Sequence, residues 1–136
     1  MKIKCILLID DDRATNFLNE IVIKKTDCTD QIQVAGGGQQ ALEFLKSGLA
    51  GKSPWPDLIL LDINMPMMNG WQFLEEFKKL KMVKKDEIVI VMLTTSINPE
   101  DQAKAETIEE VSGFRNKPLT TDIIYELLQA HFTDSL

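Results

Sequence analysis

Three consecutive carboxylates, Asp10, Asp11 and Asp12, directly follow an apolar run at positions 7–9. Adjacent negative charges repel one another, so a folded chain keeps them together only where a cation or water offsets the repulsion. Mg²⁺ prefers hard oxygen ligands, and proteins usually hold it with one or two carboxylates, a phosphate oxygen and water. Asp10 and Asp11 suit this role, so the sequence predicts that a divalent cation binds here.

Three more polar side chains stand at the ends of later β-prone runs: Asp62, Thr94 and Lys117. In a parallel sheet, the carboxyl ends of the strands meet at one edge, where the active crevice lies. This edge would therefore combine acids, a hydroxyl and a cation, a set that suits phosphoryl transfer to a carboxylate. Asp62 would be the nucleophile. Lys117 and the Thr94 hydroxyl would each contact a phosphoryl oxygen.

A count of charges explains why the metal ion is needed. Phosphorylated Asp62 would carry roughly −2, which together with roughly −2 from Asp10 and Asp11 gives about −4. Mg²⁺ and Lys117 would reduce this total to about −1. Without the metal ion, the phosphorylated product would be strongly repelled.

Strand-like and helix-like segments alternate along the chain, and five such units in succession predict an α/β fold with helices on both faces of a parallel sheet. The first predicted helix carries Phe17, Leu18, Ile21 and Val22 at the spacing of an apolar helix face. The predicted strands are 3–9, 32–35, 57–62, 87–96 and 111–116, and the predicted helices are 14–25, 37–48, 69–81, 98–110 and 120–132.

One connection, 47–57, is long for such a unit, and Pro54 and Pro56 stiffen its last part. Trp55 lies between these prolines. The residues leave two interpretations open: Trp55 contacts a partner, or it packs on the domain as a lid.

Length and composition favour one domain. With 136 residues and 44% hydrophobic content, the chain suits a single domain over 1–136 without a separate output domain. The net charge is −6 and no basic stripe appears, which argues against nucleic-acid binding. The apolar runs fall short of the ~20 residues of a membrane helix, and no leader cleavage pattern follows the first one, so a cytoplasmic location is expected. Cys5 in a strand and Cys28 in a polar turn have neither disulfide nor zinc spacing.

Four motifs, "LLIDDD", "LLDINMPMMNG", "VMLTTS" and "FRNKPL", resemble in order and spacing those of response-regulator receiver domains of two-component signalling. The resemblance covers nearly the whole chain and is to the stand-alone, chemotaxis-regulator-like type. It implies a flavodoxin-like sheet of five parallel strands in the order 2-1-3-4-5.

The resemblance also implies a role for each site residue. Asp10 and Asp11 match the metal-binding acid pair. Asp62 matches the phosphoacceptor, which also contacts the metal. Thr94 matches the switch hydroxyl, and Lys117 matches the phosphate-binding lysine.

Neighbouring positions follow from the same match. The backbone carbonyl of Asn64 corresponds to a further metal ligand, and the implied cofactor is Mg²⁺, with Mn²⁺ as a substitute. Asp12 falls just beyond the acid pair and is expected to cap the next helix. Pro66 and Gly70 shape the loop after the acceptor, where Gly70 permits a tight turn. The Lys117–Pro118 bond is expected to be cis.

Activation in this family involves a shift between two packings. Thr94 moves toward the phosphoryl group and an aromatic side chain of the fifth strand turns inward, which remodels the face formed by the fourth helix, fifth strand and fifth helix. The matching aromatic is Phe114, where the family more often has Tyr, so a hydroxyl is missing here. Asn64 and Ser96 match positions that tune hydrolysis of the aspartyl phosphate.

The implied phosphoryl donor is a sensor histidine kinase or a phosphotransfer protein. The remodelled face would bind a downstream protein or, after phosphorylation, a second copy of the chain. The chain would be a switch rather than a turnover enzyme. Two alternatives are a pseudo-receiver that binds partners without phosphorylation and a Mg²⁺-dependent phosphatase of the haloacid-dehalogenase type. The phosphatase would use Asp10, Asp12, Thr94 and Lys117 but would leave the motif around Asp62 without a purpose.

Overall fold

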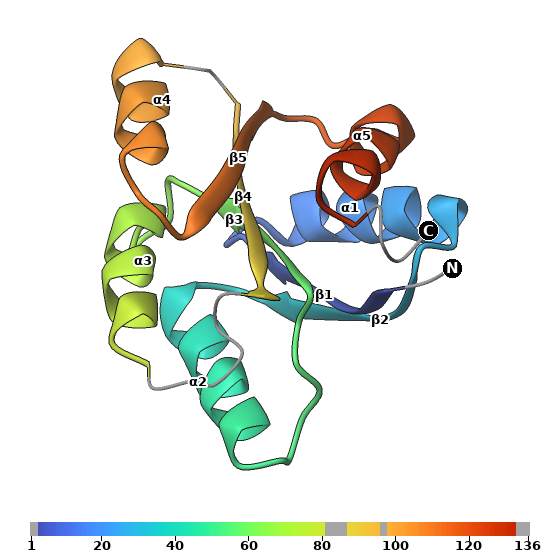
Figure 1. Ribbon diagram of the computed structural model, residues 1–136, viewed down its shortest axis with the longest axis horizontal. Helices are drawn as coiled ribbons and strands as arrows, with labels where there is room; N and C mark the ends of the chain where they lie inside the picture. Colours follow the sequence, from blue (N-terminus) through green and yellow to red (C-terminus); the bar gives the residue numbers. More distant parts are fainter. Residues whose placement is uncertain (1–2, 81–86, 96–97, 133–136) are drawn as a thin grey trace.

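The computed structural model describes residues 3–80, 87–95 and 98–132. Within these residues, five parallel strands form one sheet in the order β2-β1-β3-β4-β5, with helices on both faces (Figure 1). This confirms the fold predicted from the sequence. The elements are β1 (Ile3–Ile9), α1 (Arg13–Thr26), β2 (Thr29–Ala35), α2 (Gly38–Leu49), β3 (Leu58–Asp62), α3 (Gly70–Lys78), β4 (Val89–Thr94), α4 (Pro99–Glu106), β5 (Val111–Asn116) and α5 (Thr121–His131).

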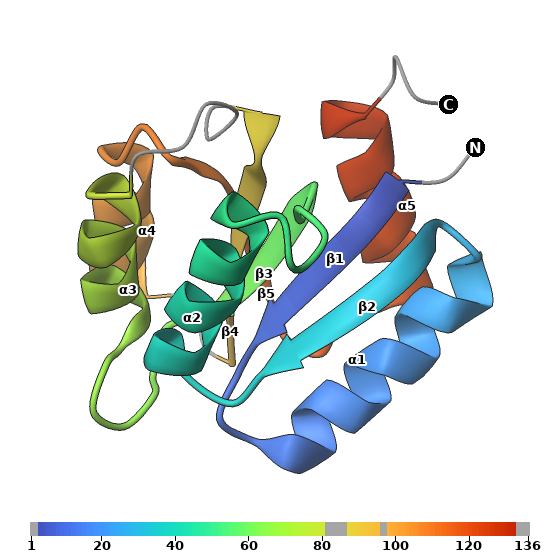
Figure 2. The same cartoon turned by 90° about the horizontal axis from the view of Figure 1, so that it is seen from below.

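Two hydrophobic clusters lie on opposite faces of the sheet. Successive side chains of a strand point to opposite faces, so Leu7 and Ile9 of β1 join the cluster under α2, α3 and α4. Ile6 and Leu8 join the cluster under α1 and α5. Figure 2 shows the same division of helices between the two faces. The central strands are therefore buried from both sides, which explains their continuous apolar sequences.

The predicted apolar face of α1 is wrong for three of its four residues, since of the four only Val22 packs against the core. Phe17 and Leu18 are 64% and 59% exposed, and Ile21 is exposed as well, whereas Asn16 and Asn19 are buried together with Ile23. Asp12 caps the start of α1, and the Asn16 side-chain amide donates a hydrogen bond to the Asp10 carbonyl just after β1. The inward face of α1 therefore carries two asparagines and differs from its most apolar face.

Helix α4 is shorter than the predicted 98–110 and ends at Glu106. Asn98 caps its start, with Pro99 in the first turn as expected from the sequence. Ala105 is the one residue of α4 that is buried. The following Ile108 packs against the core through a turn rather than through another turn of helix.

The long connection packs on the body of the domain. A Cβ atom added to Gly48 of α2 would lie 2.7 Å from the Trp55 ring, so the indole rests directly on this glycine. This contact favours the lid interpretation of Trp55. At the end of the connection, the Asp57 carboxylate accepts hydrogen bonds from the backbone N–H groups of Lys4 (2.6 Å) and Cys5 (3.3 Å), which ties it to β1.

Both cysteines are free thiols in the core. Cys28, expected in a polar turn, is only 4% exposed and packs with the cluster under α1 and α5. Burial, reinforced by the charge of Asp57, raises the pKa of Cys5 to about 11. Within the described residues, no helix combines the length and the apolar character needed to cross a membrane.

Candidate functional site

The predicted site residues meet at the carboxyl edge of the sheet. Asp10 follows β1, Asp62 ends β3, Thr94 ends β4, and Lys117 follows β5. Parallel pairing in register brings these strand ends together, because Ile9 lies opposite Leu61 and Asp62 lies opposite Leu93. Asp10, Asp62 and Thr94 are all buried, so the polar edge is enclosed by the fold rather than spread over the surface.

Lys117 bridges the two buried carboxylates. Its Nζ atom lies 2.6 Å from Asp10 Oδ2 and 3.1 Å from Asp62 Oδ1. The backbone N–H of Lys117 donates to the Thr94 carbonyl at 2.6 Å, and the Lys117–Pro118 bond is cis as predicted. Burial by itself would lower the pKa of Lys117, but the hydrogen bond and charge of Asp10, aided by Asp62, outweigh it and raise that pKa.

Asp62 lies in a negative environment. Burial and the charge of Asp10 raise the pKa of the Asp62 carboxyl, against the opposing effect of Lys117. Asp11 adds to the repulsion from its exposed position. The site therefore holds more negative charge than Lys117 alone offsets, which is the electrostatic condition that favours binding of a cation.

The three acids offer a suitable ligand set. One carboxylate oxygen from each of Asp10, Asp11 and Asp62 lies within 4.8 Å of the other two. Hard carboxylate oxygens grouped in this way fit Mg²⁺ or Mn²⁺, which share a preference for oxygen ligands. Asn64, two residues after Asp62, is exposed, and the role of its backbone carbonyl as a further ligand stays a prediction.

Asp12 has a different role, as predicted. Its carboxylate accepts hydrogen bonds from the Ala14 backbone N–H (3.1 Å) and the Thr15 hydroxyl (2.9 Å), so it caps α1. The hydrogen bond from Thr15, followed by that from Ala14, lowers the pKa of the Asp12 carboxyl. The backbone N–H of Asp12 also donates to Asp10 Oδ1 at 2.9 Å. The acidic triplet therefore divides into two acids of the cluster and one helix cap.

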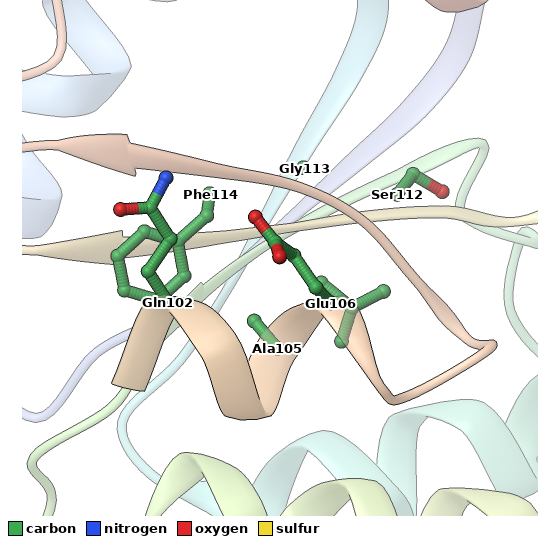
Figure 3. A pocket seen from close by; sticks show the side chains of 7 residues that line it. Gln102, Ala105, Glu106, Ser112, Gly113 and Phe114 are labelled. Carbon is green, nitrogen blue, oxygen red and sulfur yellow. The ribbon is translucent and has the colours of Figure 1, made fainter. Parts of the chain in front are cut away.

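Phe114 of β5 lies opposite Met92 of β4, two residues before Thr94. Its ring is partly buried against the core cluster and lines a pocket of about 220 Å³ between α4 and β5. Figure 3 shows Gly113 and Phe114 of β5 on one side of this pocket and Gln102, Ala105 and Glu106 of α4 on the other. Ser96, the second predicted tuning position, lies outside the described residues.

The sequence interpretation missed two features of the site. Asn16, expected on no particular face, is buried, and its Nδ2 atom donates to the Asp10 carbonyl at 2.9 Å. Gly70 was expected to permit a tight turn, but a Cβ atom there would lie 2.7 Å from the Asp62 carbonyl oxygen. The need at Gly70 is therefore space beside Asp62. A polar residue six positions after a strand-end acid is the signal that could have pointed to Asn16.

Comparison with known proteins decides the family. A model of the response regulator receiver domain matches residues 6–129. The chain belongs to this family. The receiver-domain core thus extends from within β1 to near the end of α5 and includes every strand end of the polar edge.

Relatives and solved structures agree with this assignment. Response regulator Rcp1 of Synechocystis is 37% identical over 99 residues, which cover 72% of this chain and 66% of Rcp1, slightly under two thirds. A two-component response regulator from Cytophaga hutchinsonii has a TM-score of 0.89 at 37% identity, covering 97% of this chain and 98% of that one. The Mn²⁺-bound form of response regulator Rcp1 has a TM-score of 0.70 at 32% identity, and the match covers 94% of this chain and 91% of the Rcp1 chain.

Proposed function

We propose that this receiver domain is a phosphorylation-dependent switch that accepts a phosphoryl group on Asp62 with the help of Mg²⁺. One observation carries the proposal: Lys117 lies 2.6 Å and 3.1 Å from two buried carboxylates, Asp10 and Asp62, that share a cluster with Asp11. A cationic side chain held beside a carboxylate nucleophile and an acid pair is the arrangement that phosphoryl transfer to aspartate requires.

In the proposed reaction, a carboxylate oxygen of Asp62 attacks the phosphorus of a phosphorylated histidine. The new O–P bond forms as the P–N bond breaks, and the imidazole leaves with the electron pair. Lys117, which pairs with Asp62, would neutralise a phosphoryl oxygen. The buried Thr94 at the end of β4 supplies a hydroxyl donor at the same edge.

Asp10 and Asp11, with Asp62, would hold the divalent cation. When bound, Mg²⁺ offsets the charge of the carboxylates and of the phosphoryl oxygens. That the similar protein Rcp1 has a Mn²⁺-bound form supports binding of a divalent metal, and the three converging carboxylates of this chain fit one. Mn²⁺ is proposed to substitute for Mg²⁺.

The donor is proposed to be a sensor histidine kinase or a phosphotransfer protein, and the output a change in partner binding at the face of α4, β5 and α5. Phe114 is proposed to be the aromatic side chain that turns inward on activation. Asn64 and Ser96 are proposed to tune the rate at which the aspartyl phosphate hydrolyses. A single domain over 1–136, a cytoplasmic location and a phosphorylation-dependent homodimer stay predictions. The phosphatase alternative loses support because Asp12 caps α1.

Intact-mass spectrometry after incubation with acetyl phosphate tests the proposal. The wild-type chain should gain one phosphoryl group in the presence of Mg²⁺ and none in the presence of a chelator. Asp62→Asn should gain none, and Asp11→Asn should gain it far more slowly. Asp12→Asn is the matched control, because this neighbouring acid caps α1 and should leave phosphorylation intact.

Two results would contradict the proposal. Normal labelling of Asp62→Asn would assign the phosphoryl group to another residue. Failure of the wild type to react with acetyl phosphate or with any phosphohistidine donor would instead favour the pseudo-receiver that binds partners without phosphorylation.

A further inference from the structure

The two acids that follow β1 are held in different ways. The Asp10 carboxylate accepts a hydrogen bond from the Asp12 backbone N–H at 2.9 Å and pairs with Lys117 at 2.6 Å. The Asp11 carboxylate is exposed and, within the residues that the structure describes, makes no hydrogen bond or ion pair. Before a cation arrives, the direction of Asp11 therefore depends on its backbone.

Asn16 bonds to the backbone that leads into Asp11. Its side chain is buried on α1, and its Nδ2 atom donates to the Asp10 carbonyl oxygen at 2.9 Å. This carbonyl belongs to the peptide group that joins Asp10 to Asp11, and a peptide group is planar. A hydrogen bond that fixes the carbonyl oxygen also fixes the orientation of the following N–H and the direction in which the chain enters Asp11.

We propose that Asn16 is a positioning residue that orients Asp11 for the metal ion through the Asp10–Asp11 peptide. The proposal rests on the function proposed above, in which Asp10, Asp11 and Asp62 hold Mg²⁺. It concerns a residue outside the cluster itself. Mg²⁺ demands near-octahedral geometry, so a ligand held only by its backbone gains from a donor that fixes this backbone.

The other half of the Asn16 amide supports this role. Its Oδ1 atom is buried without a hydrogen-bond partner among the described residues. An unsatisfied buried oxygen destabilises the folded state, and an apolar side chain of similar size would avoid that cost. Stability alone therefore gives little reason for an asparagine here. The bond from Nδ2 to the Asp10 carbonyl gives one.

The surroundings of Asn16 point the same way. Asn16 lines an open pocket of about 620 Å³ together with Asp10, Asp11 and Gln40. This pocket lies beside the acid pair and opens to solvent, so a hydrated cation can reach the pair from the side that Asn16 borders. Lys117 lines a different pocket, with Pro118 and Leu119.

Calorimetric titration of the metal-free protein with Mg²⁺ tests the role of Asn16. Asn16→Leu should bind Mg²⁺ about tenfold more weakly than the wild type, the order of effect expected when a group that orients a metal ligand is lost. Its melting temperature without Mg²⁺ should stay within a few degrees of the wild type, because loss of the donor to Asp10 is offset by removal of the unpaired Oδ1. A merely structural asparagine would instead change stability and leave the affinity of the folded protein unchanged.

Asn19→Leu is the matched control, because Asn19 is also a buried asparagine of α1 but lines the pocket beside Pro118. It should leave the affinity for Mg²⁺ unchanged. If Asn16→Leu does not fold, Asn16→Ala removes the same donor with less change in shape and should show the same loss.

A double-mutant cycle then tests whether Asn16 acts through Asp11. In an Asp11→Asn background, Asn16→Leu should cause no further loss of affinity, since the oriented carboxylate is already absent. An equal loss in both backgrounds, or unchanged affinity in Asn16→Leu alone, would overturn the inference. If the wild type binds no Mg²⁺, the proposed function fails. If the wild type binds and Asn16→Leu binds equally well, only the role of Asn16 fails.

Discussion

The carboxyl edge of β1 and β3 and the side formed by α4 and β5 are built in opposite ways. All five residues of β3 are buried, whereas none of the six residues of β5 is. At the first edge, buried polar groups are held by short bonds such as that between Lys117 and Asp10 (2.6 Å). On the second side, α4 buries only Ala105, and β5 carries an irregularity at Ser112, which has no counterpart in β4.

The difference in packing suits two proposed roles: phosphoryl transfer at the carboxyl edge of β1 and β3, and a conformational response on the side of α4 and β5. Phosphoryl transfer needs its groups fixed before the donor arrives, because reorganisation during the reaction would raise the barrier. A switch also needs a part that can repack at low cost, and sparse apolar contacts make repacking cheap. The pocket between α4 and β5, with Phe114 on its wall, lies in the sparsely packed part (Figure 3).

The largest effect is expected when Lys117, the cationic side chain between Asp10 and Asp62, is removed. Lys117→Met leaves Asp10 and Asp62 facing each other without a positive partner, so the metal-free protein should lose about 3 kcal/mol of stability. Phosphorylation of Asp62 should become too slow to detect with acetyl phosphate. Mg²⁺ should restore part of the lost stability, because a bound cation replaces the missing charge. Thermal unfolding with and without Mg²⁺ measures both effects.

Lys79→Met is the control for that experiment. Lys79 also forms an ion pair, with Glu76 at 2.9 Å, but this pair is exposed at the end of α3, where solvent screens it, and its loss should have little effect on stability. If Lys117→Met were no more destabilising than Lys79→Met, the polar edge would not be the rigid region described above.

A smaller effect is expected beside Asp62, the proposed acceptor. Gly70→Ala places a methyl group 2.7 Å from the Asp62 carbonyl oxygen and 3.1 Å from Ile63 Cα, so the backbone that carries Asp62 must move. We expect a loss of about 2 kcal/mol and slower phosphorylation. Gly37→Ala is matched to it, because nothing lies within 4 Å of the added methyl group, and it should leave both properties nearly unchanged. If denaturant unfolding gave the same stability for both variants, the backbone around Asp62 would be able to move at little cost, and the contrast with the α4–β5 side would be weaker.

Much of this architecture could be predicted because its signals are local and repeated. Apolar runs that end in polar side chains mark the strands and their carboxyl ends, so the sequence alone predicts that Asp10, Asp62, Thr94 and Lys117 share one edge. Asp12 could be separated from the acid pair because a short acidic side chain at that offset caps a helix.

The remaining features depend on contacts between distant segments. Spacing alone placed Phe17 on the inward face of α1, but Asn16 and Asn19 face inward in its place, and Asn16 bonds to the backbone just after β1. Gly70 looked like a turn residue because its sequence neighbours do not reveal that the Asp62 carbonyl lies against it. Cys28 was expected in a polar turn because its sequence neighbours are polar, and they do not reveal that its side chain packs in the cluster under α1 and α5.

The smallest effect should appear on the sparsely packed side. Lys104 of α4 lies 4.6 Å from the centre of the Trp71 ring on α3, a contact between an exposed cation and an aromatic face that contributes about 0.5–1 kcal/mol. Lys104→Met should therefore speed hydrogen exchange of α4 amides by about two- to fivefold, since these amides open locally, and leave β1 and β3 unchanged. Trp71 fluorescence should change in the same variant. Equal acceleration in β3 would mean that α4 and the acceptor edge open together, and the division between a fixed site and an adaptable face would then fail.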